Sequence, residues 1–138
     1  MKTTFKSVVV ALALAASALA SATPLNSIFT SSDNKVFSID QARSITFASG
    51  TVTLVFVDGN SSYTYLADSD GSVANKIKAS TSFTQFIKVG NTNEYLKPAF
   101  AKYIVCQNSQ TTIGWNVGSS TMLSDGCAFQ QAVKAVSN

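Results

Sequence analysis

The chain has 138 residues, of which 46% are hydrophobic and 12% are charged, and it contains no histidine. The absence of histidine excludes the usual general base near neutral pH, the Ser-His and Cys-His nucleophile pairs and the commonest metal ligand. Two cysteines alone do not complete an ordinary zinc or haem site. We therefore expect no metal, no cofactor and no enzymatic activity.

The start of the chain, over 1–22, has the pattern of a secretory signal peptide. Lys2 and Lys6 precede an apolar run over 8–20, and the small residues at 18–22 offer two cleavage sites. The apolar run is shorter than the roughly 20 residues needed to cross a bilayer, which argues against a membrane span. We therefore expect a signal peptide over 1–22, a single globular domain over 23–138, and a secreted or periplasmic location.

The overall charge of the exported part is low. Once Lys2 and Lys6 leave with the signal, eight basic and seven acidic residues remain, a net charge of +1. A near-neutral surface argues against nucleic acid or an anionic membrane as the main partner, because both rely on clustered Lys and Arg. The eight basic residues are spread along the chain: Lys35, Arg43, Lys76, Lys78, Lys88, Lys97, Lys102 and Lys134.

Each half of the chain reads as strands followed by one helix. In chain order, short strands are expected over 26–31 and 35–39, longer strands over 43–48, 51–57 and 61–66, and then a helix capped by Asp70. The second half begins with short strands over 84–89 and 94–97 and ends with a helix capped by Asp125. Strand parity predicts one core face. It carries Ile45, Phe47, Leu54, Phe56, Ile104, Cys106, Ile113 and Trp115.

The two halves of the chain align with each other. Segment 42–47 aligns with 101–106, and after a length difference 69–71 aligns with 124–126. These matches predict an internal repeat, at about 26–80 and 84–137. The expected fold class is α+β: an internally duplicated chain, each half an antiparallel β-meander followed by one α-helix, packed as a single pseudo-symmetric domain. Whether the sheets form layers or a closed barrel is left open.

This repeated order of strands and then a helix resembles the unit of the PUR and Whirly single-stranded nucleic-acid binders. The resemblance lies in the predicted topology and not in any matched motif. It implies a third function hypothesis, an exported relative of single-stranded nucleic-acid-binding folds, which a basic groove with exposed aromatic side chains would favour. Export and the low net charge count against this hypothesis.

The two cysteines, Cys106 and Cys127, both lie in the exported part, where disulfides persist. Cys106 is on the predicted core face and Cys127 opens the second helix, so a bridge would tie that helix to its sheet. The alternative is two unpaired cysteines that behave as small hydrophobic residues. We expect a structural disulfide.

Four tyrosines are the candidate binding face: Tyr63, Tyr65, Tyr95 and Tyr103. Tyrosine combines a large contact area with a polar tip, which suits protein or carbohydrate contacts. The alternative is that these rings complete a second core between the sheets. The leading functional hypothesis is a small secreted or periplasmic non-enzymatic binding or structural module with an unknown protein or glycan partner, with self-association as an option. The second hypothesis is a small secreted hydrolase that uses carboxylate or serine chemistry.

Overall fold

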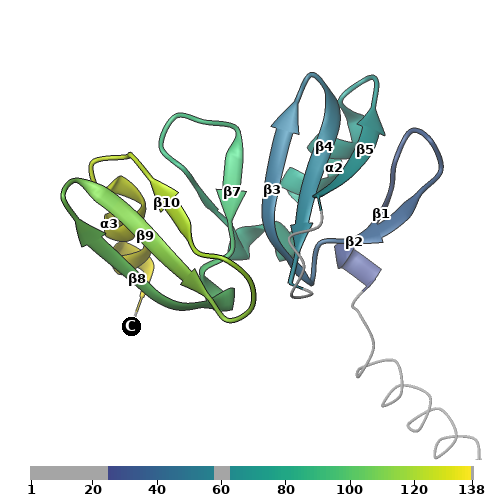
Figure 1. Cartoon of the computed structure of the whole chain (residues 1–138). Coiled ribbons are helices and arrows are strands. Elements are labelled where there is room, and N and C mark those ends of the chain that lie inside the picture. The colour runs from purple at the N-terminus through teal and green to yellow at the C-terminus, as the bar shows by residue number, and fades with distance from the viewer. Residues whose placement is uncertain (1–24, 58–62, 138) are drawn as a thin grey trace, which may run out of the picture.

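The computed structural model describes residues 25–57 and 63–137. The expected signal peptide over 1–22 lies outside the described residues, and so does the start of the strand expected over 61–66. Within the described ranges the protein is an α+β structure in which antiparallel sheets pack with two α-helices (Figure 1). No helix in these ranges is both long enough and apolar enough to cross a membrane.

The first half contains a hairpin, a meander and a helix. β3, β4 and β5 form the antiparallel meander, and β1 and β2 form a separate two-stranded sheet. The bounds are η1 (Leu25–Ser27), β1 (Ile28–Thr30), β2 (Val36–Ser38), β3 (Ala42–Ala48), β4 (Gly50–Phe56), β5 (Tyr63–Asp68) and α2 (Ser72–Ala79).

The second half also runs from two short strands to a meander and a helix, with an additional 3₁₀ turn, η3, before the meander. The strand expected over 84–89 is instead the end of a 3₁₀ turn followed by a two-residue strand, because Thr84 donates its hydroxyl to the Thr81 carbonyl and favours the turn. The bounds are η2 (Thr81–Gln85), β6 (Ile87–Lys88), β7 (Glu94–Leu96), η3 (Pro98–Phe100), β8 (Ala101–Gln107), β9 (Gln110–Trp115), β10 (Thr121–Leu123) and α3 (Ala128–Val136).

The β6–β7 hairpin joins the two halves. It adds to the first meander and produces a five-stranded sheet of order β5-β4-β3-β7-β6, whereas the second meander is a three-stranded sheet of order β10-β9-β8. Figure 1 shows β7 between the two meanders, with β1 and β8 at opposite ends of the molecule. The described strands therefore form separate packed sheets and not one closed barrel.

Tight turns connect the paired strands of each meander. Gly50 begins β4 with a φ of +79°, and Asn108 and Ser109 between β8 and β9 have φ values of +52° and +61°. Two consecutive left-handed residues are the geometry of a two-residue hairpin that matches the strand twist. The same bulge occurs near the start of both meanders, between 42 and 44 and between 101 and 103.

The predicted core face is largely correct. Ile45, Leu54 and Ile113 are fully buried, and Phe47 and Trp115 are nearly so. Phe56 and Ile104 are half-buried and pack against the cores, whereas Cys106 is exposed, so the prediction is wrong for Cys106. β8 is an end strand, so its side chains have a packed neighbour on one side only.

The helix caps also differ in part from expectation. Asp125 accepts the backbone N–H groups of Cys127 and Phe129 at 3.0 and 2.8 Å, as a cap should. In the first half Asp68, and not Asp70, receives two N–H groups of the first helical turn, those of Val73 and Ala74. Asp70 accepts the N–H of Ser72, which lies at the start of α2.

Candidate functional site

The four tyrosines of the candidate binding face do not form one surface. Tyr63 and Tyr65 are 62% and 63% exposed, and their rings stack with centroids 6.4 Å apart. Tyr65 pairs with Thr53 on β4, and the same row continues to Glu94 on β7, so Tyr65 and Glu94 share a face. Tyr95, the next residue, therefore lies on the opposite face of the same sheet.

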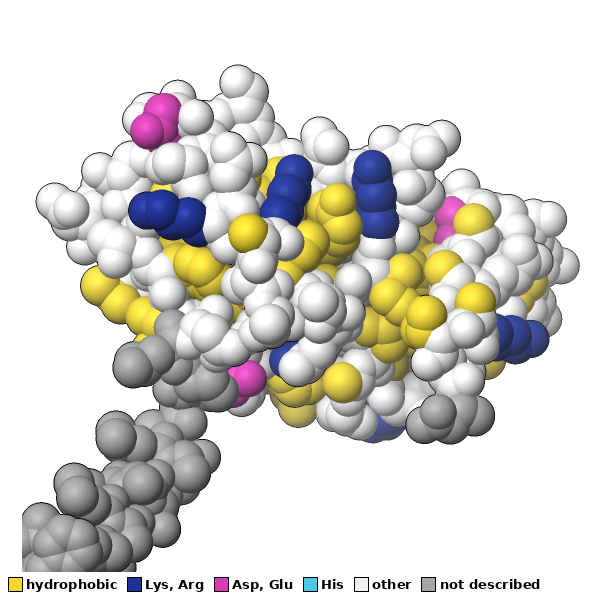
Figure 2. Space-filling view, turned by 180° about the vertical axis from the view of Figure 1, so that it is seen from behind, with side chains coloured by type: hydrophobic (Ala, Val, Ile, Leu, Met, Phe, Trp, Pro, Cys, Tyr) yellow, Lys and Arg dark blue, Asp and Glu magenta, His cyan; other side chains and the backbone are white. Residues whose placement is uncertain are grey.

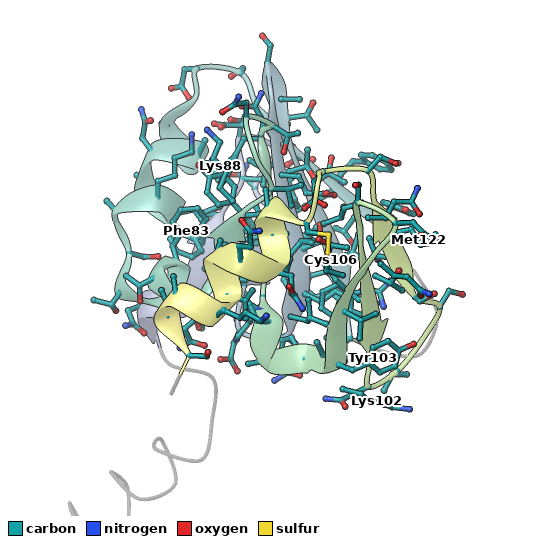
Figure 3. All side chains as sticks on the ribbon, turned by 90° about the vertical axis from the view of Figure 1, so that its left-hand side faces the viewer. Phe83, Lys88, Lys102, Tyr103, Cys106 and Met122 are labelled. Carbon is teal, nitrogen blue, oxygen red and sulfur yellow. A yellow bond between two sulfur atoms is a disulfide. The ribbon has the colours of Figure 1, made fainter. Side chains whose placement is uncertain are left out.

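Tyr103 lies on the other sheet. Its ring covers Gly114 on β9 so closely that a Cβ atom at Gly114 would be 2.2 Å from the ring. Tyr103 is 51% exposed, and Met122 on β10, 64% exposed, also stands out from this sheet (Figure 3). The four tyrosines predicted to form one binding face thus lie at three separate places. That any of these places binds a partner stays a prediction.

An aromatic cluster covers the opposite face of the five-stranded sheet. Phe83 of η2 contacts Tyr95 at 4.8 Å between ring centroids and Phe47 at 5.8 Å. Tyr95 in turn contacts Phe47 at 5.6 Å, and Phe86 stacks on Phe83 at 5.9 Å. Phe83 and Tyr95 are only partly buried, so the cluster reaches the surface.

Two lysines flank this cluster. Lys78 of α2 places its Nζ 4.6 Å from the centre of the Phe47 ring. Lys88 of β6 stands directly opposite Tyr95 in the β6–β7 pair, and Figure 3 shows it on the same side of the molecule as Phe83. Both lysines are exposed. Figure 2 shows basic side chains spaced along one face of the molecule, with hydrophobic surface between them. We call Lys78, Phe83, Lys88 and Tyr95 the lysine–aromatic face.

An open hollow of about 460 Å³ adjoins this face. Phe47 and Lys78 line it together with the amide side chains of Asn75 and Asn93. Asp70 also lines it, and the hydrogen bond from Ser72 lowers the pKa of the Asp70 carboxyl. The hollow thus offers a cation, an anion and hydrogen-bonding amides beside the aromatic rings.

Not all the basic residues reach the surface. Arg43 is 8% exposed, donates to the Val117 carbonyl at 3.1 Å and lies over the Trp115 ring. Lys97 is 6% exposed and donates to the Asp40 carbonyl at 3.0 Å, and burial lowers the pKa of its ammonium group. These two cations hold the halves of the molecule in place, and the exposed lysines form the charge that a partner meets.

Two carboxylates meet at a second hollow, of about 420 Å³, which Glu94 and Asp125 both line. Burial raises the pKa of Glu94. For Asp125, burial acts in the same direction, but hydrogen bonds from the Phe129 N–H, the Thr111 hydroxyl and the Cys127 N–H outweigh it and lower the pKa. Because these bonds occupy both oxygens of Asp125, this carboxylate is committed to the start of α3. Within the described residues no three acidic or cysteine side chains gather as a metal site.

The cysteine pair expected from the sequence is in place. Cys106 of β8 and Cys127 lie at disulfide distance, with Cα atoms 5.4 Å apart. Cys127 is the residue immediately before α3, so the link joins the sheet to its helix.

Comparisons with known proteins give one structural likeness. No family model and no curated protein sequence matches the chain. Among solved structures, the LytTr DNA-binding domain of a putative methyl-accepting/DNA response regulator from Bacillus cereus is similar, with a TM-score of 0.49 and 10% sequence identity. The likeness covers 78% of this chain and 96% of that domain.

Two functional expectations from the sequence are corrected. The similar solved domain is named a DNA-binding domain, whereas the sequence predicts a secreted non-enzymatic module with a protein or glycan partner and argues against nucleic acid. The net charge of the exported part does not show where on the surface the charged side chains lie. Lys78 and Lys88 are exposed and belong to segment 71–93, which contains no acidic residue, so positive charge is concentrated locally although the total is low.

A local charge pattern in the sequence could have revealed the lysine–aromatic face. Segment 71–93 contains Lys76, Lys78 and Lys88 but no acidic residue, and two phenylalanines lie between the lysines. Over the whole chain the basic residues are spread out, whereas within this segment they have no acidic neighbour. Phe83 lies just outside the strand expected over 84–89, so strand periodicity does not reveal it.

Proposed function

We propose that this protein binds single-stranded nucleic acid on the lysine–aromatic face. The observation that carries the proposal is the placement of Lys78 and Lys88 on either side of the partly exposed rings of Phe83 and Tyr95. Proteins that bind single strands without sequence preference combine a positively charged track for phosphates with aromatic side chains on which bases stack. This surface contains both parts.

The charge of the surface suits a phosphate backbone. The acid-free segment 71–93 supplies three lysines, and Lys78 and Lys88 come from different elements, α2 and β6, so the charge extends across the face. Each lysine that neutralises a phosphate releases condensed counterions, which makes the affinity salt-dependent. With few lysines, the affinity should be modest and should fall only gradually with salt, because the slope is proportional to the number of phosphates neutralised.

The aromatic part favours a single strand over a duplex. Phe83 and Tyr95 are held at fixed angles by their contacts with Phe47 and Phe86, so little side-chain entropy is lost when a base stacks on them. The bases of a duplex are stacked on one another and do not offer their faces. An unpaired base can reach the rings while its phosphates contact the lysines.

Fluorescence anisotropy with a labelled oligothymidylate of about 16 nucleotides tests the proposal. Lys78→Gln and Lys88→Gln should each weaken binding several-fold and lower the slope of log affinity against log salt by about 0.7. Phe83→Leu, which keeps an apolar side chain, should lose about 1–3 kcal/mol of binding free energy. A duplex of the same length should bind less tightly.

Matched controls locate the site. Lys102→Gln removes a charge on β8, which Figure 3 separates from Phe83 and Lys88, and should leave the affinity nearly unchanged. Tyr65→Ser removes an exposed ring from the other face of the sheet. The proposal is overturned if the oligonucleotide does not bind at low salt, or if Tyr65→Ser weakens binding and Phe83→Leu does not.

We further propose that the protein acts by binding and not by catalysis, and that it does so outside the cytoplasm. The commitment of Asp68 and Asp125 to helix starts supports the first point, because it leaves few carboxylates for chemistry. The cysteine pair at disulfide distance is compatible with the second. Edman sequencing tests the signal peptide, and an exported protein that still begins at Met1 would contradict it.

An internal duplication remains a proposal as well. It is supported by equivalent strand registers: 42 pairs with 56 and 44 with 55 in the first meander, and 101 with 115 and 103 with 114 in the second. The sequence alignment of the two halves relates these pairs to one another position by position. Gly71 precedes α2 and Cys127 precedes α3, and both have a left-handed backbone. In the structure Gly71 therefore corresponds to Cys127, whereas the sequence alignment sets Gly71 against Gly126.

A further inference from the structure

The outer edge of β8 is a free strand edge in the part of the chain that the structure describes. β8 pairs only with β9 and ends the three-stranded sheet. Its counterpart in the first half, β3, is flanked by β4 on one side and by β7 on the other. A free edge presents unpaired backbone N–H and C=O groups and is a template for another strand.

The pairing of β7 with β3 shows what this kind of edge accepts. The strands are antiparallel, with Ser44 opposite Leu96 and Ile45 opposite Tyr95. Backbone bonds flank these pairs: the Phe47 N–H donates to the Asn93 carbonyl at 3.0 Å, and the Lys97 N–H donates to the Arg43 carbonyl at 2.9 Å. In β3, the odd-numbered residues therefore direct their backbone groups toward β7.

β2 is the element of the first half that corresponds to β7. In the alignment that sets 42–47 on 101–106, Val36 matches Tyr95 and Phe37 matches Leu96. Phe37 and Leu96 are each buried in the core of their own half, at 8% and 2% exposure. Tyr95 packs on the core of the other half, whereas Val36 is 69% exposed. β2 pairs only with β1, so its second edge is also free among the described strands.

The outer edge of β8 is uncovered among the described strands, whereas the equivalent edge of β3 is covered by β7. Ile104 on β8 corresponds to the fully buried Ile45 but is only half-buried, and its neighbour Val105 is 42% exposed. In the β8–β9 hairpin the two turn residues are 108 and 109, so 107, 105 and 103 bond to β9. The backbone groups of Ile104 therefore point to the free edge, as those of Ile45 point to β7.

We propose that β2 of one molecule adds to β8 of a second molecule as an antiparallel strand, with Val36 opposite Ile104. The register of β7 on β3 then places Phe37 opposite Tyr103 and Lys35 opposite Val105. Figure 1 places the β1–β2 hairpin and β8 at opposite ends of the molecule, so the contact joins copies head to tail. A head-to-tail contact leaves the same two edges free at the ends and extends into a chain unless it closes into a ring.

Sedimentation velocity on the full chain over a range of concentrations tests this assembly. Species larger than a monomer should increase with concentration. Val36→Lys, which places a charge on the added strand without affecting a buried site, should shift the association to at least tenfold higher concentration. Met122→Lys is the matched control, because Met122 is 64% exposed but lies on β10, away from the edge. Association that Val36→Lys leaves unchanged, or a monomer at every concentration, would overturn the proposal.

Cross-linking tests the register. Lys35→Cys and Val105→Cys are prepared as separate proteins. These two positions are chosen because their counterparts, Glu94 and Thr46, form a directly opposed pair. In a non-hydrogen-bonded antiparallel pair the Cα atoms are about 4.5 Å apart, within the range of a disulfide. A covalent dimer should form in the mixture and not in either protein alone. Equal dimer formation by one variant alone, or by Lys35→Cys mixed with Met122→Cys, would contradict the head-to-tail register.

Discussion

The two halves of the molecule follow one order of elements but close their cores differently. In the first half α2 buries Ile77 completely, and Phe47 contacts Phe83 of η2 and Tyr95 of the β6–β7 hairpin. In the second half the position of Phe47 is taken by Cys106, which lies at disulfide distance from Cys127 at the start of α3. Where few apolar side chains are available, a covalent link holds a helix on a sheet without the burial of a large apolar area.

The difference has a second consequence at the strand edges. The first meander is completed by the β6–β7 hairpin, which brings Lys88 and Tyr95 beside Lys78 and Phe83 and so creates the lysine–aromatic face. The second meander has no described hairpin on its outer edge and keeps β8 open. The pairing of β7 with β3 therefore creates the proposed nucleic-acid site. No equivalent strand pairs with β8 among the described residues, and this leaves its edge available for the proposed assembly.

The largest expected difference between the halves is in the helix side chains. Ile77→Ala should cost about 2–5 kcal/mol of unfolding free energy, because Ile77 is fully buried. Val133→Ala at the corresponding position of α3 should cost about 1 kcal/mol or less, because Val133 is only partly buried. Urea denaturation monitored by circular dichroism measures both. Equal losses would mean that the second core is as closed as the first.

Removal of the cysteine link should affect the second half selectively. The double variant Cys106→Ser, Cys127→Ser should lose about 3 kcal/mol, the chain-entropy value for a link across roughly 20 residues. Hydrogen exchange should show the amides of α3 losing protection while those of α2 keep theirs. Reduction of the unmodified protein is the control and should give the same pattern. Equal loss of protection in both helices would contradict the division of labour between the halves.

The helix cap of the second half should make stability depend on pH. The folded-state pKa of Asp125 is lowered, so its contribution is complete above the unfolded value, near 3.8, and is lost as the pH falls through the folded value. Asp125→Ala should cost about 1–2 kcal/mol at neutral pH. The gap between variant and unmodified protein should narrow in acid. Denaturation midpoints measured from neutral to strongly acid pH check this, and a gap independent of pH would contradict it.

The smallest effect is expected at Glu94, between the halves. Burial raises its folded-state pKa, so its protonated form favours folding below the unfolded value and this stability is lost as the pH rises through the folded value. Glu94→Gln should therefore raise the thermal midpoint slightly at neutral pH and leave it unchanged in acid. A lower midpoint at neutral pH would show that the charged carboxylate has a stabilising partner.

Local patterns in the sequence determined the secondary structure and much of the core. The alternation that predicted the strands over 43–48 and 51–57 gave the buried faces of Ile45 and Leu54. Asp125 as a cap and the pairing of Cys106 with Cys127 also followed from sequence position. These features depend on neighbours within one meander or one turn, which a short window contains.

Only the tertiary structure decided which surfaces are available. Tyr63, Tyr65, Tyr95 and Tyr103 look alike in sequence, yet strand parity and sheet order place them at three separate sites. Likewise, the sequence counts Arg43 and Lys97 as surface charge, whereas packing buries both and leaves Lys78 and Lys88 beside the aromatic rings. The physical reason is that β7 pairs with a strand about 50 residues earlier, and a contact at that distance leaves no mark in local periodicity.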